Sequence, residues 1–217
     1  RRAPTGTPRR DGQQSPSTEN VLSTVFAPTT SGASYLNALT TELAARADRD
    51  GLLGVAFRYL DSPFGQLLVA ATEVGVVRLA FASEDHDVVL NELADTVSPR
   101  ILEFPRRTDD ASRQLDEYFA RRRRAFDLPV DLRLVRGFRR DVVSHLTKIP
   151  YGTTSSYGEL AAAVGNPRAV RAVGSACAHN PVPLIVPCHR VVRSDGTIGD
   201  YLGGTETKRS LLALEAA

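Results

Sequence analysis

The sequence is poor in sulfur and in long apolar runs. It has no Met and only two Cys residues, Cys177 and Cys188, which form neither a CxxC motif nor a disulfide framework. No apolar run approaches the ~18 residues that a membrane span needs, and the amino terminus lacks the apolar core of a secretory signal. We therefore expect a cytoplasmic protein without a membrane partner. The missing initiator Met suggests a trimmed or partial chain.

A strong net charge is also missing, but the charge that is present is unevenly distributed. The formal net charge is +2 over 217 residues. Residues 131–217 carry 11 Arg or Lys against 7 Asp or Glu, whereas residues 1–130 carry 16 against 18. The positive surplus therefore lies in the second half, where it could form a basic surface. The run Arg121 to Arg124 either extends this basic surface or is the solvated end of a helix.

The first 130 residues indicate a tail, a short helix and an α/β domain. Residues 1–33 are rich in Pro, Ser, Thr, Gly and Arg, which predicts a disordered tail. Residues 34–54 predict a short amphipathic helix and a linker. In the domain predicted at 55–130, a meander of three strands precedes two helices and an extended linker. The strands are expected at 55–59, 66–71 and 75–81, the helices around 88–97 and 115–119, and the linker at 127–131.

Residues 131–217 indicate a mainly helical domain. Apolar residues at helical spacing mark one helix from Phe138 to Ile149 and two more around 157–164 and 169–176. The turn at 165–167 would make the last two a helix-turn-helix. Small residues surround Arg171 on the third helix, so its backbone could approach a narrow groove. The family resemblance given below implies that Arg171 would then fill the place of a displaced base. The alternative is a surface Arg171 that pairs with Glu159.

The candidate for chemistry is Cys188, which follows an apolar run and Pro187. We expect residues 184–186 to form a short buried strand, with a turn that begins at Cys188. His189 is the nearest candidate base, and the guanidinium of Arg190 would raise the thiolate fraction. The alternative is an inert buried cysteine beside a surface histidine.

Several longer stretches resemble the O6-alkylguanine-DNA alkyltransferases, and the resemblance is strong over about residues 131–217. They are Pro187 to Gly196, Gly199 to Gly204, Tyr151 to Ala161, Gly165 to Gly174 and Lys208 to Glu215. The resemblance implies an α/β amino-terminal domain of ribonuclease-H-like fold, followed by a mainly α catalytic domain of winged-helix or helix-turn-helix type that binds DNA.

The resemblance also implies direct-reversal DNA repair. The thiolate of Cys188 would displace O6 of guanine from the alkyl carbon of O6-methylguanine and, less efficiently, act on O4-methylthymine. The product is a thioether, which water cannot hydrolyse, so each protein would react once. The implied partner is double-stranded DNA that carries O6-alkylguanine, bound by a monomer.

Roles for single residues follow from the same resemblance. His189 would take the thiol proton through a bridging water, and Glu215 would be the third member of the triad. Tyr157 would donate a hydrogen bond to the guanine, and Asn180 would brace the turn. The remaining residues implied in substrate or DNA binding are Arg171, Ala172, Arg190, the carbonyl of Val191, Tyr201, Leu202 and Gly203.

We expect neither a cofactor nor a metal. A zinc site from Cys177, His179, Cys188 and His189 is conceivable by residue type, but adjacent Cys and His rarely ligate one ion. Two other functions stay open. A thiol hydrolase with a Cys-His-Glu triad would turn over and would need an oxyanion hole. A helix-turn-helix protein that only binds or senses alkylated DNA is the third alternative, although relatives that only bind lesions lack the cysteine.

Overall fold

The computed structural model describes residues 30–216. The chain divides into two compact units at Thr40 and Thr41, and helix α2 (Thr30–Arg49) crosses this division. The predicted helix at 34–49 is therefore confirmed. Most of the predicted tail, residues 1–29, lies outside the described residues. The helix begins at Thr30, four residues before the expected start at residue 34.

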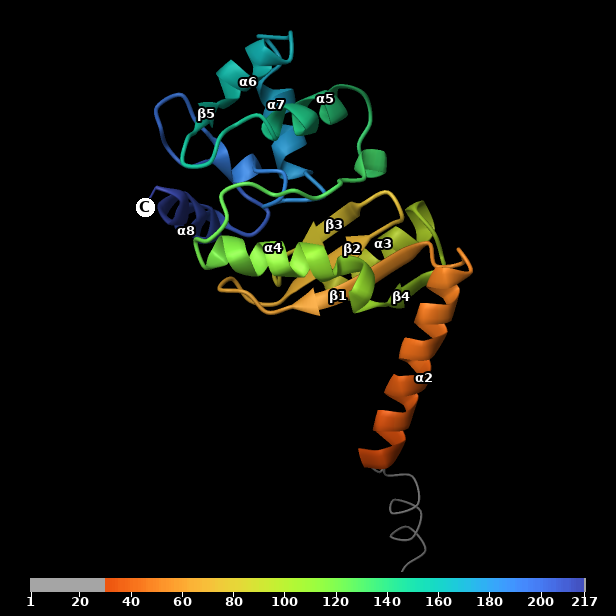
Figure 1. The fold of residues 1–217 in the computed structure, drawn as a ribbon. Coiled ribbons are helices and arrows are strands. Elements are labelled where there is room, and N and C mark those ends of the chain that lie inside the picture. Colours follow the sequence, from red (N-terminus) through yellow and green to blue (C-terminus); the bar gives the residue numbers. More distant parts are fainter. Residues whose placement is uncertain (1–29, 217) are drawn as a thin grey trace, which may run out of the picture. The chain divides into compact units, whose positions relative to one another are not determined.

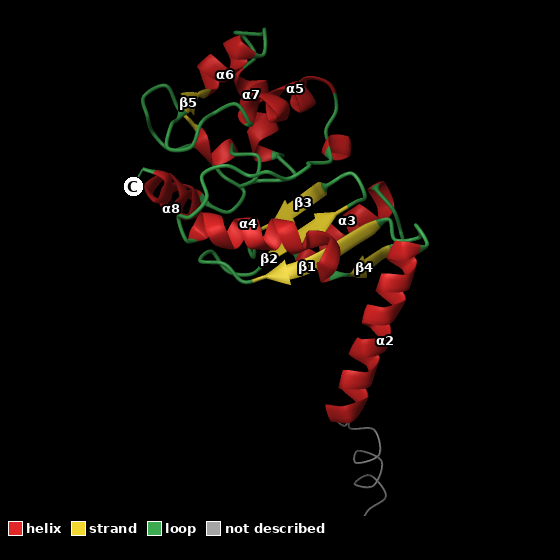
Figure 2. Ribbon diagram, in the orientation of Figure 1, coloured by secondary structure: helices red, strands yellow, loops and turns green. Residues whose placement is uncertain are grey.

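A four-stranded sheet organises the first half of the larger unit (Figures 1 and 2). The predicted meander is confirmed: β1 (Val55–Leu60), β2 (Leu67–Ala71) and β3 (Val76–Ala80) pair antiparallel in sequence order. A fourth strand, β4 (Ile101–Glu103), joins β1 in parallel. Three residues are too few to show a strand's alternation, so the sequence did not predict β4.

The two faces of this sheet are covered by different helices. Successive side chains of a strand point to opposite faces. Leu67 and Val69 thus pack in one core cluster with α4 (Asp109–Phe119), and Leu68 and Ala70 in another with α3 (His86–Thr96). Both predicted helices are confirmed. The first cluster continues into the second half of the chain, so the two halves share one core.

The connection between the halves follows the edge of β3. The 3-10 helix Pro105–Thr108 leads directly into α4. Helix α4 ends at Phe119, before the run Arg121 to Arg124, because Arg121 adopts a left-handed φ of 58°. The predicted extended linker pairs with the edge strand. Val76 donates its N–H to the carbonyl of Pro129 at 2.9 Å, and Asp131 donates to the carbonyl of Val76 at 2.9 Å.

The second half is mainly helical, and its three predicted helices are confirmed as α5 (Gly137–Leu146), α6 (Tyr157–Ala163) and α7 (Val170–Ala178). A capping box formed by Ser156 and Glu159 starts α6. The other elements are the 3-10 helices Leu132–Leu134 and Cys188–Arg190, helix α8 (Thr205–Glu215), and the short parallel pair of β5 (Ser155–Ser156) and β6 (Val191–Val192). Among the helices within residues 30–216, none combines the length and hydropathy of a membrane crossing.

The strand expected at residues 184–186 is wrong. The segment is buried, but it forms tight turns in which Val186 donates to the carbonyl of Val182 at 2.9 Å and Leu184 has a φ of 70°. Pro181, Pro183 and Pro187 lack the N–H that a strand ladder needs, so the chain bonds to itself. The turning therefore begins several residues before Cys188, which opens a 3-10 helix.

Candidate active site

Cys188 is held by the turns that precede it. Its side chain is 2% exposed, at the first position of the 3-10 helix. The buried side chain of Asn180 ties these turns together: its Nδ2 donates to the carbonyl of Val186 at 2.8 Å, and its Oδ1 accepts from the N–H of Val182 at 3.1 Å. The thiol is thus fixed by hydrogen bonds within a few residues of itself.

The thiol of Cys188 is protonated at neutral pH. Burial raises the pKa of Cys188 to about 11, although a hydrogen bond with Asn180 and the positive charge of Lys208 act in the opposite direction. Since the thiolate is the nucleophilic form, a reaction at this sulfur requires a base that removes the proton.

The adjacent His189 is a suitable base. It is 0% exposed, and its Nε2 lies 2.9 Å from Oε1 of Glu215. Burial lowers the pKa of His189, which favours the neutral imidazole. Because the carboxylate can only accept, we assign the proton to Nε2, which leaves Nδ1 as the basic nitrogen. Nδ1 is buried, and no protein group of the described residues bonds to it.

Glu215 receives several hydrogen bonds and lies in the last turn of α8, 4% exposed. Arg190 donates from Nε to Oε2 and from Nη2 to Oε1, both at 2.9 Å. The N–H of Gly152 donates to Oε2 at 3.2 Å, and the hydroxyl of Tyr118 donates to Oε1 at 2.7 Å. Burial by itself would raise the pKa of Glu215, but hydrogen bonds from His189 and Arg190 hold it at about 2. The carboxylate is therefore ionised at neutral pH.

The contacts of Arg190 differ from those that the sequence suggested. It is 6% exposed, its Nη1 donates to the carbonyl of Ile149 at 2.6 Å, and its guanidinium lies 5.8 Å from the ring centre of Tyr151. Together with the two bonds to Glu215, these contacts place Arg190 as the carboxylate's partner. The sequence had suggested instead that it activates the thiol or binds DNA.

A pocket of about 370 Å³ lies along α7, from its first residue to its last. Burial raises the pKa of Tyr157, which lines this pocket, to about 12, so its hydroxyl remains a donor at neutral pH. Gly199 lies in one of the family-like stretches of the sequence, but it was not predicted as a residue of the site. A Cβ at that position would lie 2.7 Å from the Tyr157 hydroxyl, so only glycine fits there without displacing it. The pocket is lined by Tyr157, Val170, Arg171, Gly174, Ser175, Ala178, Arg193, Gly199 and Asp200.

Arg171 and Ala172 are exposed on α7. The predicted alternative, a pair between Arg171 and Glu159, is wrong. Glu159 instead accepts from the N–H of Ser156 at 2.6 Å, as part of the capping box. Within residues 30–216, Arg171 makes no ion pair, so its charge is available at the surface next to the pocket.

The loop before α8 packs against the first half of the chain. The ring of Tyr201 lies edge-on to Phe81, with centres 5.5 Å apart, and to His189, at 6.4 Å. Gly203 lies so close to Phe81 that a Cβ would be 3.0 Å from the ring. The carbonyl of Leu202 accepts from Ser83 at 3.4 Å. This loop therefore covers His189 from the side of the sheet.

Lys208 is a residue of the site that the sequence interpretation missed. It is 1% exposed, its Nζ donates to the carbonyl of Val191 at 2.6 Å, and it lies 5.9 Å from the ring centre of Tyr157. One acceptor position of the Val191 carbonyl is therefore already used. Lys208 and Glu215 share the buried face of α8 with Leu211. Charged residues at positions i and i+7 around a buried Leu were the available signal.

The four residues of the zinc alternative differ in their surroundings. His179 is exposed, and its Nδ1 contacts the carbonyl of Ser175 at 2.7 Å. Burial raises the pKa of Cys177 to about 12. In the described part of the chain, no group of three or more His, Cys, Asp or Glu residues could hold a metal ion.

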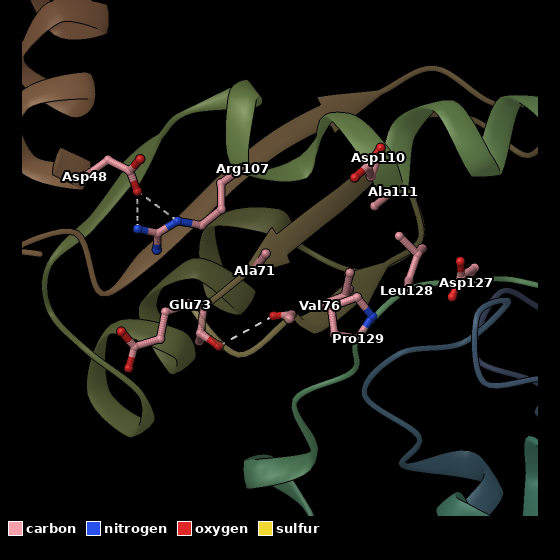
Figure 3. Close-up of a pocket in the computed structure, with 12 residues that line it drawn as sticks. Asp48, Ala71, Glu73, Val76, Arg107, Asp110, Ala111, Asp127, Leu128 and Pro129 are labelled. Atoms are coloured by element: carbon pink, nitrogen blue, oxygen red, sulfur yellow. Dashed lines mark hydrogen bonds and ion pairs between the residues drawn. The ribbon is translucent and has the colours of Figure 1, made fainter.

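The pocket in Figure 3 lies in the first half, apart from these groups. Its volume is about 380 Å³, and an ion pair between Arg107 and Asp48 stands at one side. Glu73, Asp110 and Asp127 also line it, but no Cys or His does. Its lining therefore contains no thiol and no imidazole.

Comparison with known families identifies two matching regions. The family model for the ribonuclease-like domain of 6-O-methylguanine DNA methyltransferase matches residues 55–132. The family model for the DNA binding domain of 6-O-methylguanine DNA methyltransferase matches residues 137–217.

Relatives and solved structures agree with these matches. A methylated-DNA–protein-cysteine methyltransferase of Mycolicibacterium paratuberculosis is 38% identical over 161 residues, which are 74% of this chain and 92% of the relative. The constitutive enzyme of that name from Bacillus subtilis is 38% identical over 71% of this chain and 92% of its own length. The crystal structure of Mycobacterium tuberculosis OGT in complex with DNA superposes with a TM-score of 0.64 at 38% identity, over 74% of this chain and 92% of that one.

Proposed function

We propose, because this chain belongs to the 6-O-methylguanine DNA methyltransferase family, that Cys188 is the residue that accepts the alkyl group. The protein is a methylated-DNA–protein-cysteine methyltransferase of DNA repair. The observation that carries the assignment is that His189, which directly follows Cys188, is buried and bonded to Glu215 of α8. The other cysteine, Cys177, belongs to α7 and is not followed by a comparable pair.

The triad would work by moving one proton. A water between Nδ1 of His189 and Sγ of Cys188 would carry the thiol proton to the imidazole, since Nδ1 has no hydrogen-bond partner among the described residues. The ionised Glu215 then stabilises the imidazolium, as the acid of a triad does. The thiolate attacks the alkyl carbon, a new C–S bond forms, and the C–O6 bond breaks with its electrons left on the guanine.

Lys208 would stabilise the thiolate. Its positive charge lowers the pKa of Cys188, and no carboxylate within residues 30–216 forms an ion pair with it. A buried ammonium without a paired anion is costly, and a thiolate nearby offsets part of that cost. The hydrogen bond to Val191 fixes Lys208 in place.

The substrate would be a nucleotide rotated out of double-stranded DNA. In the duplex, O6 of guanine lies on the major-groove edge of a stacked base, out of reach of a buried sulfur. The pocket beside α7 would receive the base, Tyr157 would donate to it as charge develops, and Arg171 would occupy the space left in the duplex. The Val191 carbonyl and the loop of Tyr201, Leu202 and Gly203 would complete the pocket, with Ala172 at the DNA surface. The DNA complex of the mycobacterial relative supports this partner.

Transfer would stop after one event per protein. A thioether on Cys188 has no carbonyl for water to attack, so the sulfur is not regenerated. O6-methylguanine is the proposed main substrate, and O4-methylthymine a poorer one.

The test is incubation with duplex DNA that carries O6-methylguanine at several ratios of DNA to protein, followed by intact-protein mass spectrometry and peptide mapping. We expect one added methylene on Cys188 at every ratio. Continued turnover would instead support a thiol hydrolase, and no modification would support a protein that only binds lesions. Arg171→Ala should slow transfer from the duplex far more than transfer from free O6-benzylguanine, which needs no base rotation. Equal losses on both substrates would contradict that role.

A further inference from the structure

Tyr118 connects the ribonuclease-like half of the chain with the proposed triad. It lies near the carboxyl end of α4, within the stretch that matches the ribonuclease-like domain. Its side chain is 0% exposed, and its hydroxyl donates to Oε1 of Glu215 at 2.7 Å. Figure 1 shows α8, which carries Glu215, beside this end of α4.

The acceptor atom is the important feature of this contact. Oε1 of Glu215 is also the oxygen that lies 2.9 Å from Nε2 of His189. The terminal torsion of a glutamate is soft, so the direction of Oε1 is set by its hydrogen-bond donors. Tyr118 and Arg190 both donate to this oxygen as well, at 2.7 and 2.9 Å. They therefore fix the oxygen to which the imidazole is bonded.

The hydroxyl of Tyr118 is well suited to hold a carboxylate. Burial, followed by the negative charge of Glu215, raises the pKa of Tyr118 far above its usual value, so the group stays a donor. Its ring contacts three other aromatic rings, those of Phe119, Phe126 and Tyr151, with centre distances of 5.6, 5.3 and 6.2 Å. Packing on several sides restricts the ring, and with it the hydroxyl.

We propose that Tyr118 is a positioning residue for the alkyl transfer, which fixes Oε1 of Glu215 so that His189 is held in the orientation that accepts the thiol proton. This inference rests on the proposed function of Cys188. It gives the ribonuclease-like half a direct part in the reaction, although this half supplies no group that touches the substrate pocket.

Other contacts of this half differ in kind from that of Tyr118. The N–H of Leu79 donates to the carbonyl of Pro181 at 2.8 Å, and Phe81 packs on Tyr201. These contacts hold loops of the site. The bond from Tyr118 instead ends on a charged group of the proton path, so its loss should change how the reaction depends on pH.

The test compares Tyr118→Phe with a matched control, Tyr151→Phe. Tyr151 adjoins Tyr118, but its hydroxyl donates to the main-chain carbonyl of Leu214 at 3.3 Å and not to the carboxylate of Glu215. Transfer of the benzyl group from free O6-benzylguanine is followed across a range of pH, together with the number of reactive equivalents and the melting temperature.

We expect Tyr118→Phe to react about tenfold more slowly at its optimum, with a full equivalent of reactive protein. The acidic limb of its pH–rate profile should lie at higher pH. A Glu215 carboxylate with one donor fewer bonds His189 more strongly and raises the pKa of His189, so the base becomes protonated, and the rate falls, at a higher pH. Tyr151→Phe should keep the wild-type profile. In a Glu215→Gln background, Tyr118→Phe should have no further effect on the rate.

Equal profiles for Tyr118→Phe and wild type would overturn the proposal, as would a lower melting temperature with an unshifted acidic limb. If Tyr118→Phe does not fold, 3-fluorotyrosine at position 118 keeps the hydroxyl and strengthens it as a donor. The acidic limb should then move to lower pH, and an unmoved limb would overturn the proposal. Wild-type protein that transfers nothing to Cys188 would reject the proposed function and this inference together. If wild type transfers the alkyl group but neither Tyr118→Phe nor 3-fluorotyrosine at position 118 changes the pH profile, only the role of Tyr118 is rejected.

Discussion

The second half contains two buried cysteines in neighbouring regions. Cys177 lies near the end of α7, and Cys188 begins the 3-10 helix that follows the turns after α7. Cys177 is 7% exposed and Cys188 is 2% exposed, and burial raises the pKa of Cys177 to about 12 and that of Cys188 to about 11. Burial therefore does not distinguish them. Cys188 differs in its hydrogen bond with Asn180 and in being followed by His189, which is bonded to Glu215. The proposed reactivity of Cys188 therefore rests on its neighbours, since burial is common to both thiols.

The largest expected effect comes from exchanging the two cysteines separately. Cys188→Ser should abolish alkyl transfer, because a serine hydroxyl has a much higher pKa than a thiol. Cys177→Ser should keep at least half of the wild-type rate, since the base lies beside the other residue. Peptide mapping after reaction with O6-benzylguanine is the measurement. A label on Cys177 in wild-type protein would reverse the comparison.

Removing the charge of Glu215 should have the next largest effect. Glu215→Gln leaves a neutral acceptor opposite His189, so the imidazolium loses its stabilising charge, and the rate of transfer should fall about 100-fold. The rate with free O6-benzylguanine measures this without base rotation. As a control, iodoacetamide should modify Cys177 at the same rate in wild type and in Glu215→Gln when both proteins are unfolded in urea. A rate within threefold of wild type would show that Cys188 does not depend on this carboxylate.

Lys208→Met should sharpen the comparison through the thiolate. Without the buried ammonium, we expect the pKa of Cys188 to rise and transfer to slow about tenfold at neutral pH. Arg209→Met is the matched control, because Arg209 is exposed and pairs with Glu206 on the same helix. The measurement is the pH dependence of the thiolate absorbance and of the transfer rate. Identical profiles for the two variants would exclude a specific effect of Lys208.

The stability of the folded protein should also report on Glu215. The pKa of this carboxyl is about 2 in the folded state, against 4.5 for a Glu side chain in water, so the folded state favours the ionised form. The resulting stability, about 3 kcal/mol, is fully present above pH 4.5 and is lost as the pH falls toward 2. Urea unfolding of wild type and Glu215→Gln between pH 2 and 7 measures it. The two free energies of unfolding should converge at low pH, and a constant difference would argue against the shifted pKa.

The smallest expected effect is that of the reaction on the protein itself. A methyl group added to Cys188 enters a packed site and should cost about 1–3 kcal/mol of stability. Alkylated and free protein can be compared by thermal melting. Asn180 bonds the turns next to Cys188 and donates its N–H to the carbonyl of Cys177, in α7, at 3.3 Å. Alkylation should therefore also disturb the end of α7 and weaken DNA binding. An unchanged melting temperature would remove this coupling and leave the assignment of Cys188 intact.

Much of the fold was predictable because its signals are local. The meander and helices α3 to α7 carry apolar periodicity over five or more residues, and each was expected at about its observed place. The strand expected at residues 184–186 failed because an apolar run fits either a strand or a buried turn. Only the hydrogen bonds within the run, where prolines remove the ladder donors, distinguish the two.

For the proposed site, the sequence by itself predicted the residue types and their order along the chain, since Cys188 and His189 are adjacent and lie in a specific motif. The tertiary structure decided which partners surround them. It paired Arg190 with Glu215, buried Lys208 against Val191, and brought Tyr118 from the other half of the chain to the same carboxylate. These contacts join residues that are 17 to 97 positions apart. Local periodicity shows which residues share a face of one element, but not which polar groups of different elements meet in the core.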